Sequence, residues 1–268
     1  MKVCDYCGKA NEDVMLFCAG CGTALSVSGA KIESPPIPVP KRRSRVLNAS
    51  SATFVLFIYL AVQFFCGFFA SGMTMLILSA TLSGLVMIFA SITLIPKYLK
   101  DASPTGAAWV LGQWSAIIKG LVIGLIIGVC IQAFILISKH YVAYKSLDPL
   151  NQMAFTPGLR QWVTVVLLVL LIPPLEEMMF RGILYGGYRK SFGPVWAAVS
   201  TTLIFVAMHY PSYIHFPSHV IGIIALALAT LWCRLRWNAI GPAIAVHLGY
   251  NSMLALFVVC WTWLTNHS

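Results

Sequence analysis

The chain has 268 residues, of which 59% are hydrophobic and only 10% are charged. Soluble domains usually carry about 25% charged residues, so this composition excludes an ordinary soluble protein and predicts a multi-pass protein of the cell membrane. The formal net charge is +10, a sign that is also typical of nucleic-acid-binding proteins. We expect no nucleic-acid partner, because the basic residues mostly flank apolar runs, where they orient helices and contact anionic lipid.

Two Cys-x2-Cys pairs, ten residues apart, lie within CDYCGKANEDVMLFCAGCG at residues 4–22. The glycine after each pair permits a tight turn, and two such turns offer four sulfurs to a tetrahedral Zn²⁺ ion. So short a segment cannot build its own apolar core, so metal binding would supply its folding energy. We predict a structural zinc ribbon over residues 1–25, similar to those at the ends of many bacterial membrane proteins, with the ligands Cys4, Cys7, Cys18 and Cys21. The competing interpretation is two disulfides or a redox pair, which needs an oxidising compartment.

A Pro-rich and basic linker is predicted over residues 26–47, because four prolines within six positions favour extended chain. The first forty residues are polar and lack the apolar stretch of a signal peptide. The basic run KRRSR at 41–45 directly precedes the first apolar run. By the positive-inside rule it predicts a cytoplasmic N-terminus, a compartment in which the cysteines would stay reduced.

The remaining chain, residues 48–268, is predicted to be an all-α domain with seven or eight transmembrane helices. A helix needs about 20 apolar residues to cross the bilayer. The run 219–233 is short, whereas the last run is long enough to be bent or split, which would make eight. The candidate spans are 53–70, 73–95, 115–137, 162–186, 194–210, 219–233 and 239–264.

Two carboxylates and an arginine lie in PPLEEMMFRG, residues 173–182, directly after an apolar run. A charge at mid-bilayer costs at least about 2.5–3.5 kcal/mol, so intramembrane charges are candidate functional residues. Glu177 and Arg181 are four residues apart on a helix and can pair, whereas Glu176 points elsewhere and is left free. Pro173 and Pro174 interrupt the backbone hydrogen bonds and favour a hydrated site. The alternative is a purely structural charge cluster.

Two further spacings place polar side chains on helix faces. FVAMH puts Phe205 and His209 on one face, and HLGYN does the same for His247 and Asn251. Each alone would be assigned to helix packing. Together with the glutamates, they lie in three consecutive stretches of otherwise apolar sequence.

These patterns, read as EExxxR, FxxxH and HxxxN in this order, resemble the CPBP family of intramembrane proteases over about residues 160–255. The family comprises type II CAAX prenyl endopeptidases and their bacterial relatives, some of them linked to bacteriocin processing or immunity. The resemblance implies hydrolysis of a peptide bond by a water molecule that Glu176 and His209 activate. It further implies that His247 and Asn251 stabilise the oxyanion and that Arg181 holds Glu177.

Relatives have also been described as metalloproteases with the same glutamate and histidines as ligands, and we favour the metal-free glutamate mechanism. The expected substrate is a membrane-embedded or lipid-tethered peptide or protein, and the ribbon is a candidate protein-contact module. Two other functions remain open: a proton-coupled transporter that uses the same acid, and a non-catalytic scaffold or receptor whose ribbon binds a cytoplasmic partner. Straight-helix counting places Glu176, His209 and His247 at different depths, so their assembly requires a tilted, broken or shortened helix.

Overall fold

The computed structural model describes residues 1–4, 7–15, 17–21, 25, 47–70, 72–94, 110–139, 158–210 and 219–267. These residues belong to two compact units, 1–44 and 45–268, which we describe separately. Apart from Leu47, the predicted linker at 26–47 lies outside the described residues, and so does the basic run at 41–45.

The first unit is built around a small antiparallel sheet. Strand β1 (Lys2–Val3) pairs with β2 (Ala10–Asn11). Between them, the Gly8 N–H donates to the Cys4 carbonyl over 2.8 Å, and the Cys4 N–H donates to the Lys9 carbonyl over 3.0 Å. Gly8 has φ +71°, a conformation that glycine adopts without steric cost. The glycine after the first cysteine pair therefore makes the tight turn that the sequence predicts.

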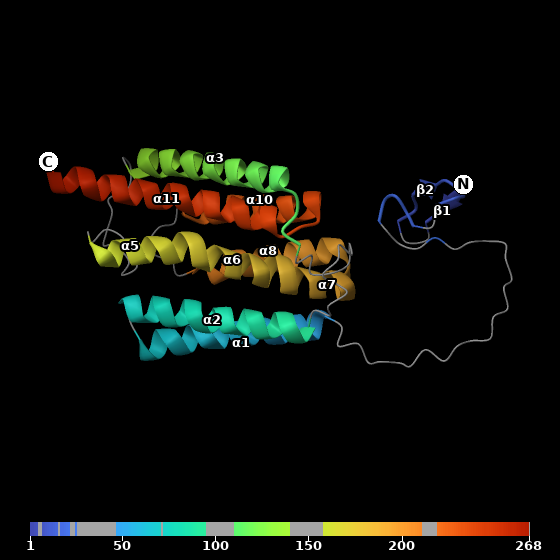
Figure 1. Ribbon diagram of the computed structural model, residues 1–268, viewed down its shortest axis with the longest axis horizontal. Coiled ribbons are helices and arrows are strands. Elements are labelled where there is room, and N and C mark those ends of the chain that lie inside the picture. The colour runs from blue at the N-terminus through green and yellow to red at the C-terminus, as the bar shows by residue number, and fades with distance from the viewer. Residues whose placement is uncertain are drawn as a thin grey trace. The chain divides into compact units, whose positions relative to one another are not determined.

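The second unit is a bundle of apolar helices (Figure 1). Among the described residues, six helical segments are long and apolar enough to cross a membrane, and a shorter apolar helix accompanies them. The protein is therefore an all-α, multi-pass membrane protein. The elements are α1 (Ala49–Phe69), α2 (Gly72–Leu94), α3 (Trp114–Lys139), α5 (Leu159–Val166), η2 (Leu167–Leu171), α6 (Ile172–Glu177), η3 (Met178–Leu184), α7 (Tyr185–Phe192), α8 (Pro194–Met208), α10 (His219–Trp237) and α11 (Gly241–His267).

The lengths of three helices differ from the sequence-based expectation. Helix α10 continues to Trp237 and has 19 residues, so it is not the short span. Helix α8 is the short one, with 15 residues, a length of about 22 Å against a hydrocarbon thickness of about 30 Å. Helix α11 runs for 27 residues without a split, so an eighth helix does not arise from it.

One continuous helical segment, from α5 to α7, lies between the α1–α2 hairpin and the α3–α11 pair (Figure 1). Pro173 and Pro174 have no N–H to donate to carbonyls four residues earlier. Before the prolines the helix widens into the π-helical turns of η2, where the Ile172 N–H donates to the Leu167 carbonyl. The proline pair therefore does not end the helix but changes its winding one turn before Glu176. A second π-helical stretch, η3, follows Glu177.

Close packing of α3 against α11 fixes the position of His247. A Cβ atom placed on Gly124 would collide with the backbone carbonyl of Val246, and one on Gly249 would collide with the carbonyl of Leu121. Small residues let membrane helices approach in this way. Because Val246 directly precedes His247, the glycines hold that histidine at the interior of the bundle, where it is 3% exposed.

Candidate active site

Three of the side chains that the sequence motifs contain, Glu176, His209 and His247, meet at one point. The Glu176 Oε2 atom, at the end of α6, lies 3.9 Å from Nε2 of His209 and 3.8 Å from Nε2 of His247. His209 follows the last residue of α8. Because α8 ends at Met208, after about 22 Å of helix, His209 lies beside the glutamate. The shortened helix therefore resolves the conflict in depth that straight-helix counting creates.

Glu177 and Arg181 form the expected i, i+4 ion pair, with 3.3 Å between Oε2 and Nε. Both side chains are buried, at 0% and 2% exposure. The guanidinium also donates from Nη2 to the carbonyl of Ala227 in α10 over 3.0 Å. It lies 4.3 Å above the ring of Phe205, a distance at which a cation is attracted to an aromatic face. Phe205, from the FxxxH motif, therefore helps to hold the arginine and does not merely fill the core.

Glu177 has a second partner that helical spacing does not predict. Its Oε1 atom lies 2.9 Å from Nδ1 of His247. A carboxylate that pairs with Arg181 is ionised and can only accept, so Nδ1 carries the hydrogen and donates it. In a neutral His247 ring, Nε2 is then the unprotonated nitrogen, and it faces Glu176. Glu177 thus orients the imidazole as the aspartate does in hydrolytic triads.

His209 is oriented in the same sense by the backbone. Its Nδ1 atom lies 2.8 Å from the carbonyl oxygen of Phe205, and a carbonyl only accepts, so Nδ1 donates. In the neutral ring Nε2 is again the nitrogen with a free lone pair, and it points at Glu176. A carboxylate and two imidazole nitrogens therefore converge on one small volume, where they can bind and deprotonate a water molecule.

Asn251 lies close to these groups but is already engaged. Its Nδ2 atom donates to the carbonyl of Leu168 in η2 over 2.8 Å. Since the amide carries two N–H groups, one remains for another acceptor. This bond ties α11 to the π-helical turns, and no spacing in the sequence predicts it.

Arg234 does not line the cavity but stabilises the backbone next to the Glu177–Arg181 pair. It directly follows the predicted span 219–233, but it lies within α10 and has 0% exposure. Its Nε atom donates to the carbonyl of Arg181 over 3.2 Å, and Nη1 donates to Oδ1 of Asn238 over 2.9 Å. It therefore fixes the backbone of η3 at the residue that holds Glu177. A basic residue beside an apolar run carries no local signal for such burial.

A cavity of about 260 Å³ opens at Glu176. Its polar lining comprises Glu176, His209, His219, His247, Tyr250 and Asn251. The sequence motifs miss His219 and Tyr250, since the first is merely the first residue of the predicted span 219–233 and the second resembles a packing residue. The other walls are aliphatic and consist of Ile135, Val165, Leu168, Ile172, Ile223, Leu226, Leu254, Ala255 and Val258. The cavity thus offers a polar centre and a long apolar wall.

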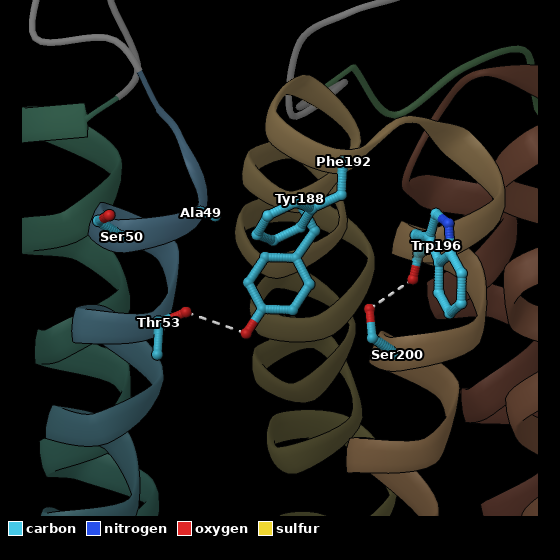
Figure 2. Close-up of a pocket in the computed structure, with 7 residues that line it drawn as sticks. All are labelled: Ala49, Ser50, Thr53, Tyr188, Phe192, Trp196 and Ser200. Atoms are coloured by element: carbon cyan, nitrogen blue, oxygen red, sulfur yellow. Dashed lines mark hydrogen bonds between the residues drawn. The ribbon is translucent and has the colours of Figure 1, made fainter.

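A larger pocket of about 750 Å³ lies between α1, α7 and α8 (Figure 2). In it the Tyr188 hydroxyl lies 2.9 Å from Oγ1 of Thr53. Its lining shares no residue with the cavity at Glu176 and holds neither a carboxylate nor an imidazole, so the groups that could act on water lie in the smaller cavity. The lining residues are Ala49, Ser50, Thr53, Tyr188, Phe192, Trp196 and Ser200.

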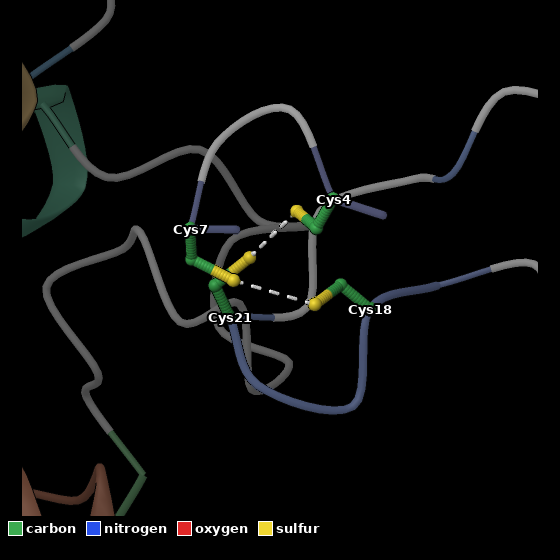
Figure 3. A group of neighbouring side chains, drawn as sticks. All are labelled: Cys4, Cys7, Cys18 and Cys21. Carbon is green, nitrogen blue, oxygen red and sulfur yellow. Dashed lines mark hydrogen bonds between the residues drawn. The ribbon is translucent and has the colours of Figure 1, made fainter. Parts of the chain in front are cut away.

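The four N-terminal cysteines converge with their sulfurs facing one another (Figure 3). Cys4 and Cys21 are 3.5 Å apart at Sγ, as are Cys7 and Cys18, and all four sulfurs lie within 4.8 Å of one another. Four thiolates at about 2.3 Å from a tetrahedral ion have similar separations, so the cluster can bind a metal ion. Among the described residues, these four cysteines form the group of at least three possible metal ligands whose donor atoms lie close enough together to share one ion. The side chains around Glu176 do not form such a group.

The surroundings of Cys18 lower the pKa of its thiol and so favour metal binding. Burial raises the pKa of its thiol, but N–H groups of Cys21 and Gly20 donate hydrogen bonds to the sulfur and lower the pKa to about 6 overall. The Gly20 N–H lies 3.3 Å from this sulfur, and the Asn11 amide lies 3.5 Å from it. Such donors favour the thiolate, which is the form that binds metals.

Residues 158–253 match the family model described as type II CAAX prenyl endopeptidase Rce1-like. The matched stretch contains all the side chains that converge at Glu176 and both π-helical segments. No curated protein and no solved structure matches the chain. The match covers 96 of the 268 residues, so this part of the chain is similar to that family.

Proposed function

Because residues 158–253 of this chain are Rce1-like, we propose that the protein is an intramembrane endopeptidase. It cleaves a peptide bond in a membrane-associated or lipid-tethered substrate. The observation that supports this proposal is the convergence of the Glu176 carboxylate with two oriented imidazoles in one cavity. The aliphatic walls of that cavity suit an apolar segment of a membrane-bound substrate.

In the proposed reaction, Glu176 acts as the general base, with His209 beside it. The carboxylate takes a proton from water as the water oxygen bonds to the substrate carbonyl carbon. The C–N bond then breaks as the protonated Glu176 returns this proton to the nitrogen, so that an amine and a carboxylic acid leave and the Glu176 carboxylate is restored. The Nε2 atoms of His209 and His247 each lie within 4 Å of the Glu176 Oε2 atom. A single water molecule at this point therefore has a base and a hydrogen-bond partner at once.

Oxyanion stabilisation is proposed for His247 and Asn251. His247 would donate from Nε2 in the ring form that carries a hydrogen on both nitrogens, while Nδ1 stays bonded to Glu177. The second N–H of Asn251 supplies another donor. Preorganised donors of this kind are worth about 2.7–4 kcal/mol each when removed from an enzyme.

Cleavage by the wild-type protein and two variants in its own membrane tests the proposal. We expect membranes from cells with the wild-type protein to contain peptide termini that are missing in cells with Glu176→Ala or His209→Ala, as read by mass spectrometry of new N-termini. Equal processing in all three strains would remove the proposal. Solute uptake into proteoliposomes that needs Glu176, without any cleavage, would instead indicate a transporter. A phenotype that depends only on residues 1–40 would indicate a scaffold.

We further propose that the cysteine cluster holds a structural Zn²⁺ ion and that the N-terminus lies in the cytoplasm. Structural zinc supplies about 10–16 kcal/mol of binding free energy in isolated finger peptides. Purified protein is expected to contain about one zinc ion per chain, measured by metal analysis. Cys18→Ser should lose most of that zinc, because three ligands bind it less tightly. The exposed Cys260 provides the control, since Cys260→Ser should keep it. Full zinc content in Cys18→Ser would contradict the assignment.

A further inference from the structure

The cavity at Glu176 contains a third histidine beyond the two that face the glutamate. His219, the first residue of α10, lines the same cavity and is half-buried. It belongs to none of the three sequence motifs.

His219 lies farther along the cavity than the reacting groups. Helices α10 and α11 are joined by residues 238–240 and run antiparallel (Figure 1). Gly222 directly faces the hydroxyl of Tyr250, since a Cβ atom there would collide with it. His219 is three residues before Gly222, about 4.5 Å away along the axis, in the direction that leads away from His247. Because His247 lies three residues before Tyr250, the two histidines are about 9 Å apart along the helix axes. At this end the cavity follows α11 past Leu254 to Val258, about 16 Å from His247 along the helix.

A peptide bound in this end of the cavity would meet mostly aliphatic side chains. Leu254, Ala255, Val258 and Ile135 cannot satisfy the N–H and C=O groups of a peptide backbone. Each such group costs free energy when it is buried without a partner. An imidazole can donate from one nitrogen and accept at the other, and His219 supplies one to this end.

We propose that His219 is a substrate-binding residue that forms a hydrogen bond to the backbone of the bound peptide about three residues from the scissile bond. An extended chain advances about 3.3 Å per residue, so the axial offset of about 9 Å between His247 and His219 corresponds to about three residues. The inference rests on the proposed protease function and extends it to a binding position outside the reacting groups. His219 is therefore expected to set affinity for longer substrates, not to take part in bond cleavage.

Peptides of graded length test this position. A peptide that contains a cleavage site mapped in the membrane comparison, with about four residues on either side, spans the cavity. Two shortened forms keep one residue on the amino or on the carboxyl side of the scissile bond. For His219→Ala, kcat/KM on the full peptide should fall about tenfold, the equivalent of one good hydrogen bond. On one shortened form the variant and the wild-type protein should differ by less than about twofold.

Three controls separate binding from folding. His219→Gln keeps a donor and an acceptor and should restore most of the loss. Ile221→Ala changes a neighbouring, exposed residue of α10 that does not line the cavity and should leave kcat/KM unchanged. Equal losses on all peptide lengths, or no loss on the full peptide, would overturn the role of His219 alone. Failure of the wild-type protein to cleave any of the peptides would overturn the proposed function as well.

Discussion

Glu176→Gln should lower kcat by about 100- to 10,000-fold, the range for removal of a general base. The amide has nearly the same shape as the carboxylate but cannot accept a proton from water. The side chain is only partly buried, at 17% exposure, and its partners are two imidazoles and not a buried cation. Folding is therefore expected to be kept, and substrate affinity should change little. Single-turnover cleavage of a mapped peptide in micelles measures the chemical step.

The matched control for this change is Glu12→Gln. Glu12 is exposed and lies in the first unit, so the same loss of charge there should leave kcat unchanged. A Glu176→Gln protein that cleaves at the wild-type rate would show that another group activates the water. A variant that loses its thermal transition would show that Glu176 stabilises the fold, and kcat would then be measured on a variant kept folded by added ligand or lipid.

Arg181→Met is expected to destabilise the fold more than any of the other single substitutions. It leaves the Glu177 carboxylate buried at 0% exposure without its cation, and breaking a buried ion pair on one side costs about 3–5 kcal/mol. It also removes the donor to the Ala227 carbonyl and the cation above Phe205. The expected result is a large drop in the temperature of unfolding in micelles. Arg160→Met, at an exposed arginine, is the control and should have little effect.

The double change Glu177→Gln with Arg181→Met separates stability from activity. Removing both charges avoids the unpaired carboxylate, so much of the lost stability should return. Activity should not return, because a neutral amide no longer holds the His247 ring with an ionised acceptor. A double variant that recovers both properties would show that the ion pair has no role in orienting His247. A single variant as stable as Arg160→Met would show that the pair is not structurally important.

The sequence by itself determined the features that depend on local spacing and composition. The membrane class follows from long apolar runs, because hydropathy needs no knowledge of contacts. The Glu177–Arg181 pair follows from the i, i+4 geometry of a helix, and the cysteine cluster follows from two short turns. The order of EExxxR, FxxxH and HxxxN was also sufficient to indicate the residues that meet at Glu176.

Only the tertiary structure decided how those residues are connected. The bond from His247 to Glu177 joins positions 70 residues apart, and that from Asn251 to Leu168 joins positions 83 apart. The depth of His209 depends on a helix that stops at Met208, and the burial of Arg234 depends on a carbonyl of another helix. Such contacts are set by how helices pack and where they end. Local patterns carry no record of either, because the same apolar faces can pack in many registers until close contacts, such as that of Gly124 with Val246, select one.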